Sequence, residues 1–284
     1  MKFFPGCLLA LLLAPALYAQ QTSSLLWKVS GNGLQQPSYL FGTFHILCKA
    51  DFSISAELEN TLKTCKSFYS EIKMDEPGLQ LQLLSKMTLT GRNIPQLVGE
   101  TEYNRISPQF KSITGMPMAM LDPFKPFLHL SLLAQKAIAC SDQVQPETEL
   151  LKLAQQYRMN IQGLETINDQ IEAIDKEPLD SQLHSLVKML QNFDSVQQVM
   201  SKLVAVYKVR DIDSIYRFMK QTGMDEDFKT AIITKRNEKW IPLMQQAMLG
   251  QPCFFAVGAG HLGGAEGVIS LLRKRGYRLT PLKF

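Results

Sequence analysis

The stretch PCFFAVGAGH at residues 252–261 decides the fold. Its five consecutive apolar residues, 253–257, are typical of a buried strand, and the glycines that follow turn the chain toward His261. The same pattern occurs near the other end of the chain, where PSYLFGTFH at residues 37–45 ends on His45. Two strands therefore each lead through a G-x-x-H turn to a histidine.

The segment that follows the first histidine adds a helix and a third strand. Residues 55–62 begin with a serine and have helical spacing of apolar residues, and residues 67–72 predict a strand that carries Glu71 near its end. A strand, helix, strand unit crosses over in the right-handed sense, which makes its two strands parallel. His45 and Glu71 are then expected at carboxyl ends of strands, where open α/β sheets bind ligands.

The middle of the chain is predicted to be mainly helical. Apolar residues recur at spacings of three and four in a series of segments: 79–87, 118–139, 147–157, 181–193, 196–209, 211–219 and 225–248. Residues 160–166 are the exception, because they predict a strand that ends near Glu165. After His261, residues 268–276 predict a helix and residues 277–282 a final strand.

Strand, turn, helix and strand therefore occur at both ends of the chain. This order predicts an α/β (α+β) fold with a central mixed sheet built from the N- and C-terminal regions and covered by the helical middle. We expect a single domain over residues 20–284, in which residues 20–77 and 250–284 form the sheet region and residues 78–249 the helical region.

Residues 1–19 have the composition of a secretory signal peptide. One positive charge, Lys2, precedes an apolar run that ends in small residues near Ala19, and the run is too short for a membrane span. The mature protein is therefore predicted to be exported, to the periplasm or the extracellular space. Its net charge of +3, after Lys2 is removed from the +4 of the whole chain, gives no indication of nucleic-acid binding.

Four cysteines remain after the signal peptide. An even number in an oxidising compartment permits two disulfides, and the alternative is free thiols buried as small apolar groups. The order of the cysteines suggests a bond between Cys48, just after the first histidine turn, and Cys140, at the end of the helix predicted at 118–139. Cys65 and Cys253, both next to predicted strands, are then left over.

The two histidine turns and the acidic strand end suggest hydrolytic chemistry. Glycine lets a strand turn sharply and lets a ligand approach closely. Two neutral imidazoles and a carboxylate are a common ligand set for a divalent ion with open coordination positions, and His45, Glu71 and His261 are such a set. A bound ion of this kind lowers the pKa of its water and polarises a carbonyl. His129 and His184 lie on predicted helices and are interpreted as structural or surface residues.

Two other classes of function remain open. In a metal-independent, esterase-like hydrolase, His45 or His261 is the general base and Glu71 orients it. In a non-catalytic protein that binds a peptide or a haem-like ligand, methionines of the helical layer form an adaptable apolar wall, namely Met116, Met118 and Met120.

Together these segments resemble the TraB/GumN family, which includes the Tiki metalloproteases and bacterial pheromone-shutdown proteins. The resemblance extends over essentially the whole mature chain. It rests on residues 39–45, the strand ending at Glu71, residues 163–166 with Gln170, Arg236 and Asn237 with Trp240, and residues 258–262 with Gly264.

The resemblance implies a fold related to the erythromycin esterases and the haem-binding ChaN-like proteins, with one G-x-x-H motif from each end. It also implies a peptidase that depends on a divalent ion such as Mn, Co or Zn. The ligands would be His45, His261 and Glu71, and Glu71 would also serve as the catalytic base. Arg236 would stabilise developing negative charge in the reaction.

Further family positions are expected to support the ligands or to contact the substrate, a peptide or a small molecule: Gly42, Thr43, Glu165, Asn237, Gly258 and Gly260. For Glu165 and Arg236, an ion pair between the helical layer and the sheet is an equal alternative. The chain departs from the family at Lys73, where near relatives often carry an acid. Asp75 and Glu76 are close enough in sequence to replace that acid.

Overall fold

A computed structural model describes residues 23–221 and 225–284. The predicted signal peptide at residues 1–19 lies outside this part of the chain. Within the described residues, no helix is both long enough and apolar enough to cross a membrane.

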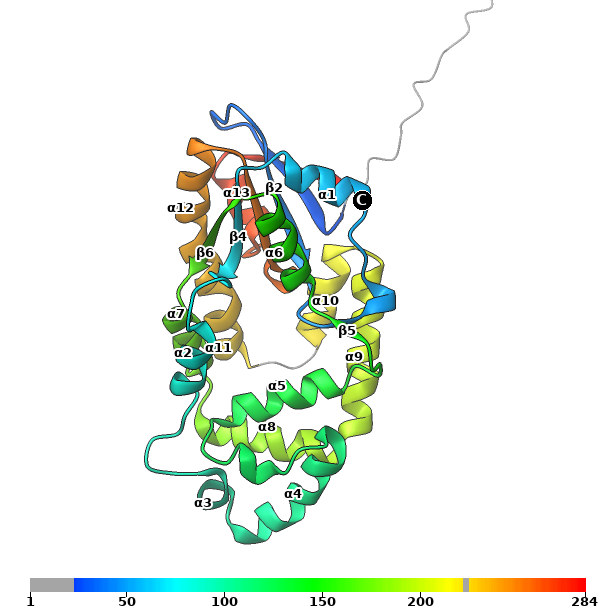
Figure 1. The fold of residues 1–284 in the computed structure, drawn as a ribbon, viewed down its shortest axis with the longest axis vertical. Coiled ribbons are helices and arrows are strands. Elements are labelled where there is room, and N and C mark those ends of the chain that lie inside the picture. Colours follow the sequence, from blue (N-terminus) through cyan, green and yellow to red (C-terminus); the bar gives the residue numbers. More distant parts are fainter. Residues whose placement is uncertain (1–22, 222–224) are drawn as a thin grey trace, which may run out of the picture.

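Six strands form one mixed sheet in the order β6-β4-β7-β2-β1-β8 (Figure 1). The strands are β1 Leu26–Ser30, β2 Ser38–Thr43, β4 Ser67–Ile72, β6 Asn160–Glu165, β7 Cys253–Gly258 and β8 Arg278–Leu282. The four strands from β6 to β2 are parallel, whereas β1 pairs antiparallel with both β2 and β8. The predicted α/β fold, with a sheet built largely from the two ends of the chain, is therefore confirmed.

The order of the strands places β7, one of the last strands in the sequence, near the centre of the sheet. β7 lies between β2 and β4, so the two parallel strands of the N-terminal strand, helix, strand unit are separated by one strand. All five residues of β7 from Cys253 to Val257 are completely buried, as expected for a parallel strand covered on both faces.

Helices pack on the sheet and complete its hydrophobic core. The main cluster joins buried residues of the strands to residues of α1 Ala56–Lys63, α6 Pro146–Gln156, α12 Lys235–Gly250 and α13 Val268–Lys274. The serine predicted to begin the first helix does so, because the side chain of Ser55 accepts a hydrogen bond from the amide of Leu58 at 3.1 Å.

The remaining helices of the described chain are α2 Leu79–Lys86, α3 Ile94–Val98, α4 Glu100–Thr114, α5 Pro126–Lys136, α7 Ile167–Ile174, α8 Leu179–Gln191, α9 Phe193–Lys208, α10 Ile212–Gln221 and α11 Glu226–Lys229. Of these, α3, α4, α5 and α8 lie together below the sheet in the view of Figure 1. They share a separate apolar cluster that includes Phe110, Leu133 and Leu186.

The helix predicted over residues 118–139 is wrong in its first part. Residues 118–120 form only a short 3₁₀ turn, and α5 begins at Pro126. Proline has no amide hydrogen and clashes with the preceding turn, so Pro123 and Pro126 prevent one continuous helix and Pro126 instead occupies the first turn of a new one. The expected wall of methionines is also wrong, because Met118 is buried in the helical cluster while Met120 is exposed.

The segment predicted as one helix at 225–248 is helical but irregular. A π-helical segment, Thr230–Thr234, separates α11 from α12. Such segments insert an extra residue into the turn and often occur at functional sites. Arg236 lies directly after it, in the first turn of α12.

A second, very small sheet joins two distant loops. β3 Leu47–Cys48 pairs antiparallel with β5 Gln143–Val144, and a disulfide connects Cys48 with Cys140 beside this pair. The pairing proposed from the sequence is therefore confirmed. Cys65 and Cys253 are buried free thiols.

Candidate functional site

Three predicted site residues come from three neighbouring parallel strands. Glu71 lies on β4, while β7 leads to His261 and β2 leads to His45. Because β4, β7 and β2 are parallel, their carboxyl ends meet at one edge of the sheet. The crossover rule had predicted this edge for His45 and Glu71.

The carboxylate of Glu71 is held by three donors. Its Oε1 atom accepts a hydrogen bond from the amide of Gly258 at 2.8 Å, and its Oε2 atom accepts from Arg236 at 2.6 Å and from Gln170 at 3.3 Å. Burial raises the pKa of this carboxyl, but nearby positive charge, including that of Arg236, outweighs burial and holds the pKa well below its ordinary value. Glu71 is therefore ionised at neutral pH.

Arg236 has all of its N–H donors engaged within the protein. Nε and Nη2 donate to Glu165 at 3.0 and 2.6 Å, and Nη2 also donates to Glu71. Nη1 donates to the carbonyl of Ile232 at 2.9 Å and to Nε2 of His261 at 3.2 Å. A guanidinium has five N–H groups, so none is left for a substrate in this arrangement.

Glu165 joins the sheet to α12. Its side chain is only 2% exposed and accepts hydrogen bonds from Arg236 and, at 3.0 Å, from the indole of Trp240. Burial raises the pKa of Glu165, and the hydrogen bond and charge of Arg236 oppose that rise. Burial prevails, so the pKa of Glu165 lies above its ordinary value, and Arg236 links Glu165 and Glu71 in one buried hydrogen-bonded cluster.

The imidazole of His261 has a defined tautomer. Asn237 donates its amide hydrogens to the carbonyls of His261 and Glu266, at 3.1 and 2.9 Å, so its Oδ1 atom is an acceptor. Nδ1 of His261 lies 2.7 Å from that oxygen and must carry the proton. Nε2 is then the lone-pair nitrogen that faces Arg236. Burial lowers the pKa of His261, which keeps the ring neutral at pH 7.

His45 has a solvent-exposed side chain and is electrostatically coupled to Glu71 of that buried cluster, but it makes its hydrogen bond elsewhere. Its side chain is 78% exposed, and its Nδ1 atom lies 3.0 Å from Oε1 of Glu147, a side chain that is only 12% exposed. The hydrogen bond to Glu147 raises the pKa of His45 to about 9, an effect that water around the ring partly screens, so the ring is free to accept a proton mainly above neutral pH. The structure thus pairs His45 with Glu147 rather than with Glu71 or His261.

Glu147 was not predicted as a site residue. The sequence shows it only as the first residue of a helical pattern, and no motif joins it to His45, which lies 102 residues earlier. Only the tertiary fold brings the two together.

The glycines of both turns allow close packing at the edge of the sheet. A Cβ atom on Gly42 would lie 2.8 Å from Cδ1 of Leu262 and 3.1 Å from Cα of Ala259, and one on Gly258 would lie 3.2 Å from Oε1 of Glu71. Gly260 is similarly close to the side chain of Met219. The glycines therefore let the two turns pack against each other and against Glu71.

Thr43 ends β2, opposite Gly258 of β7 and two residues before His45. Its hydroxyl is buried and has no hydrogen-bond partner among the residues that the structure describes. An unpaired buried hydroxyl is unfavourable unless a water molecule or a ligand satisfies it. Thr43 thus carries a buried hydroxyl at this edge that is unsatisfied among the described residues.

As arranged, these residues do not fit a metal ion. Nowhere in residues 23–221 and 225–284 do three or more histidine, cysteine or acidic side chains form a group that could hold one. Arg236 contacts both Nε2 of His261 and Oε2 of Glu71, and Oε1 of Glu71 lies 3.8 Å from Nε2 of His261. Lys73 occupies the position of the expected acid, and its ammonium lies 3.5 Å from the carboxylate of Asp75.

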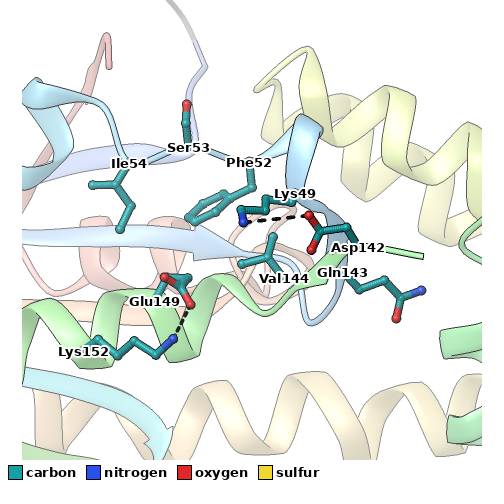
Figure 2. Close-up of a pocket in the computed structure, with 9 residues that line it drawn as sticks. All are labelled: Lys49, Phe52, Ser53, Ile54, Asp142, Gln143, Val144, Glu149 and Lys152. Atoms are coloured by element: carbon teal, nitrogen blue, oxygen red, sulfur yellow. Dashed lines mark hydrogen bonds and ion pairs between the residues drawn. The ribbon is translucent and has the colours of Figure 1, made fainter. Parts of the chain in front are cut away.

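A hollow of about 490 Å³ lies along α6, the helix that carries Glu147 (Figure 2). An apolar side chain, Phe52, lies between two ion pairs, Lys49 with Asp142 and Glu149 with Lys152. Each of these charges thus has its partner within the hollow.

Comparison with known proteins identifies the family. The sequence model of the TraB/PrgY/gumN family matches residues 25–281. The chain belongs to this family. The resemblance inferred from the two G-x-x-H motifs is therefore confirmed.

The chain is also similar to a protein from Danio rerio named metalloprotease TIKI2. The two are 22% identical over an alignment 317 positions long, which covers 91% of this chain and 61% of the Danio rerio protein, so the chain spans about three fifths of that relative. No solved structure shows a significant match.

Proposed function

We propose that this member of the TraB/PrgY/gumN family is a hydrolase that cleaves amide or ester bonds at the carboxyl edge of strands β4, β7 and β2. The observation that carries the proposal is the pair formed by His45 and Glu147. A solvent-exposed imidazole held through Nδ1 by a largely buried carboxylate is the usual arrangement of a general base. The similarity to a protein named as a metalloprotease supports the same reaction class.

In the proposed reaction, Nε2 of His45 takes a proton from water as the water oxygen attacks the carbonyl carbon of the substrate. The bond from that carbon to the leaving nitrogen or oxygen then breaks, and the leaving group takes the proton from His45. Thr43, whose hydroxyl is buried, takes no part in these steps. Arg236 acts within the protein instead, because it holds Glu71 and Glu165 in place.

A second candidate is a metal-dependent peptidase that uses His45, Glu71 and His261. The tautomers favour it, because both rings have an oxygen acceptor at Nδ1 and so present Nε2 as a lone pair, as metal-binding histidines do. Its cation would be a divalent ion such as Mn, Co or Zn, and Arg236 would have to release the two ligands that it contacts now.

We also propose that the protein is exported, to the periplasm or the extracellular space, and that residues 20–284 form one domain. The disulfide between Cys48 and Cys140 supports export, because such bonds persist in oxidising compartments.

The test is an assay of the purified protein on peptide and ester libraries, with and without exhaustive chelation. We expect activity that survives chelation and is lost in His45→Ala. The matched control is His184→Ala, an exposed histidine on α8, which should keep full activity.

Loss of activity on chelation, with recovery on addition of Mn²⁺, Co²⁺ or Zn²⁺, would replace the first mechanism with the second. Absence of turnover on every amide and ester substrate would contradict hydrolysis altogether. A peptide or haem-like molecule that copurifies with such an inactive protein would instead support a binding protein.

A further inference from the structure

Glu147 is placed to control the orientation of His45. Its carboxylate is largely buried, whereas the imidazole that it contacts at 3.0 Å is mostly exposed. A carboxylate cannot donate a hydrogen bond when it is ionised, so Nδ1 of His45 must carry the proton of this contact. The neutral ring then has its lone pair on Nε2.

The same arrangement occurs at the second histidine turn. There Oδ1 of Asn237 accepts the proton of Nδ1 in His261, at 2.7 Å, and Nε2 is again the lone-pair nitrogen. The two G-x-x-H turns thus have equivalent partners of different chemistry. The charged partner, Glu147, belongs to the solvent-exposed ring.

The contact between His45 and Glu147 depends on the small β3–β5 sheet. Leu47 and Cys48, just after His45, pair with Val144 and Gln143, just before α6. The amide of Lys49 extends this ladder by donating to the carbonyl of Asp142 at 2.9 Å.

The disulfide from Cys48 to Cys140 joins the same two segments covalently. Because each segment carries one partner of the pair only a few residues from this junction, movement of one segment against the other separates His45 from Glu147.

We propose that Glu147 is a positioning residue of the site, which fixes His45 with its proton on Nδ1. In this proposal the disulfide between Cys48 and Cys140 holds the side chains of His45 and Glu147 in contact. The effect on hydrolysis rests on the function proposed above. The effect on the tautomer of His45 does not, because it follows from the contact itself.

The first experiment is nitrogen NMR of the imidazoles at a pH where His45 is neutral. The chain has four histidines, so single substitutions assign their signals. We expect the proton on Nδ1 of His45 in the wild type and a mixture of tautomers in Glu147→Ala. Glu147→Gln keeps the size of the side chain but can donate from its amide nitrogen to Nδ1, so it should not preserve the wild-type tautomer.

Glu149→Ala is the matched control, because Glu149 lies in the same first turn of α6 but pairs with Lys152 at 2.7 Å (Figure 2). It should leave the tautomer of His45 and the rate of hydrolysis unchanged. Glu147→Ala should lower kcat by about 10⁴-fold, the usual effect of removing the carboxylate partner of a general-base histidine, with little change in KM.

Reduction of the disulfide should shift the tautomer of His45 in the same direction as Glu147→Ala. An unchanged tautomer in folded Glu147→Ala would overturn the role of Glu147, and an unchanged tautomer after reduction would overturn the role of the disulfide. If the tautomer shifts in a protein that hydrolyses nothing, the positioning stands and only the proposed function fails. Hydrolysis at the wild-type rate by Glu147→Ala would refute the inference while the proposed function stands.

Discussion

The disulfide between Cys48 and Cys140 should contribute a large part of the stability of the fold. The perturbation is the double variant Cys48→Ala/Cys140→Ala, compared with the wild type under oxidising conditions. The bond closes a loop with a sequence separation of 92 residues, and restricting the unfolded chain over a loop of that length stabilises the folded state by about 4 to 5 kcal/mol.

A contribution of this size is large beside the total stability of a typical domain, about 5–15 kcal/mol. The β3–β5 pairing and the contacts of α5 remain in the variant, so we expect it to fold but to unfold at a much lower denaturant concentration. Unfolding can be followed by guanidinium titration with circular dichroism and with the fluorescence of Trp27 and Trp240, both of which are buried.

Reductant provides the internal control. It should lower the unfolding midpoint of the wild type to that of the double variant, and it should leave the double variant unchanged because Cys65 and Cys253 are already free thiols. Equal midpoints for the oxidised wild type and the double variant, with the bond verified by mass spectrometry, would refute the reasoning.

Two further predictions concern single side chains. His129 is buried and its pKa is lowered to about 4, mainly by burial. Between pH 6.5 and about 4 the unfolded chain therefore binds more protons at this residue than the folded protein does. Unfolding titrations should lose about 3 kcal/mol of stability as the pH falls through that window, and His129→Leu should lose much less. Gly42→Ala forces a Cβ atom to 2.8 Å from Leu262 and should cost about 1–3 kcal/mol, whereas Gly250→Ala, with no described atom within 4 Å of its new Cβ, should be neutral in the same thermal melts. Equal melting temperatures for these two glycine variants would contradict the packing described for the first turn.

Local patterns were sufficient to predict most of the fold. The buried strand at Cys253–Gly258 and the strand at Ser67–Ile72 were predicted because runs of apolar and β-branched or aromatic residues end at glycine or polar residues. The rule for parallel crossovers then located the edge that carries Glu71. The same reasoning failed over residues 118–125, where helical spacing of apolar residues was given more weight than two prolines.

The partners within the site could not be predicted in the same way. Arg236 meets Glu165 and Glu71 across separations of 71 and 165 residues, and His45 meets Glu147 across 102. The sequence shows which of these side chains are polar, but not which of them the fold brings together. The metal-ligand set of His45, Glu71 and His261 therefore stays a prediction, and the structure adds the contacts of Arg236 with Glu71 and His261 and of Glu147 with His45.

The central place of β7 in the sheet has a consequence for how the molecule forms. β2 and β4 are synthesised early, but the strand that must lie between them begins only at Cys253. The amide of Gly258 that binds Glu71 comes 187 positions after it. Contacts of such long range form slowly, because the intervening chain must first be brought together at a cost in entropy. A chain still emerging from the ribosome therefore lacks this edge of the sheet until β7 has been synthesised, and Glu71 has no partner at Gly258 before then.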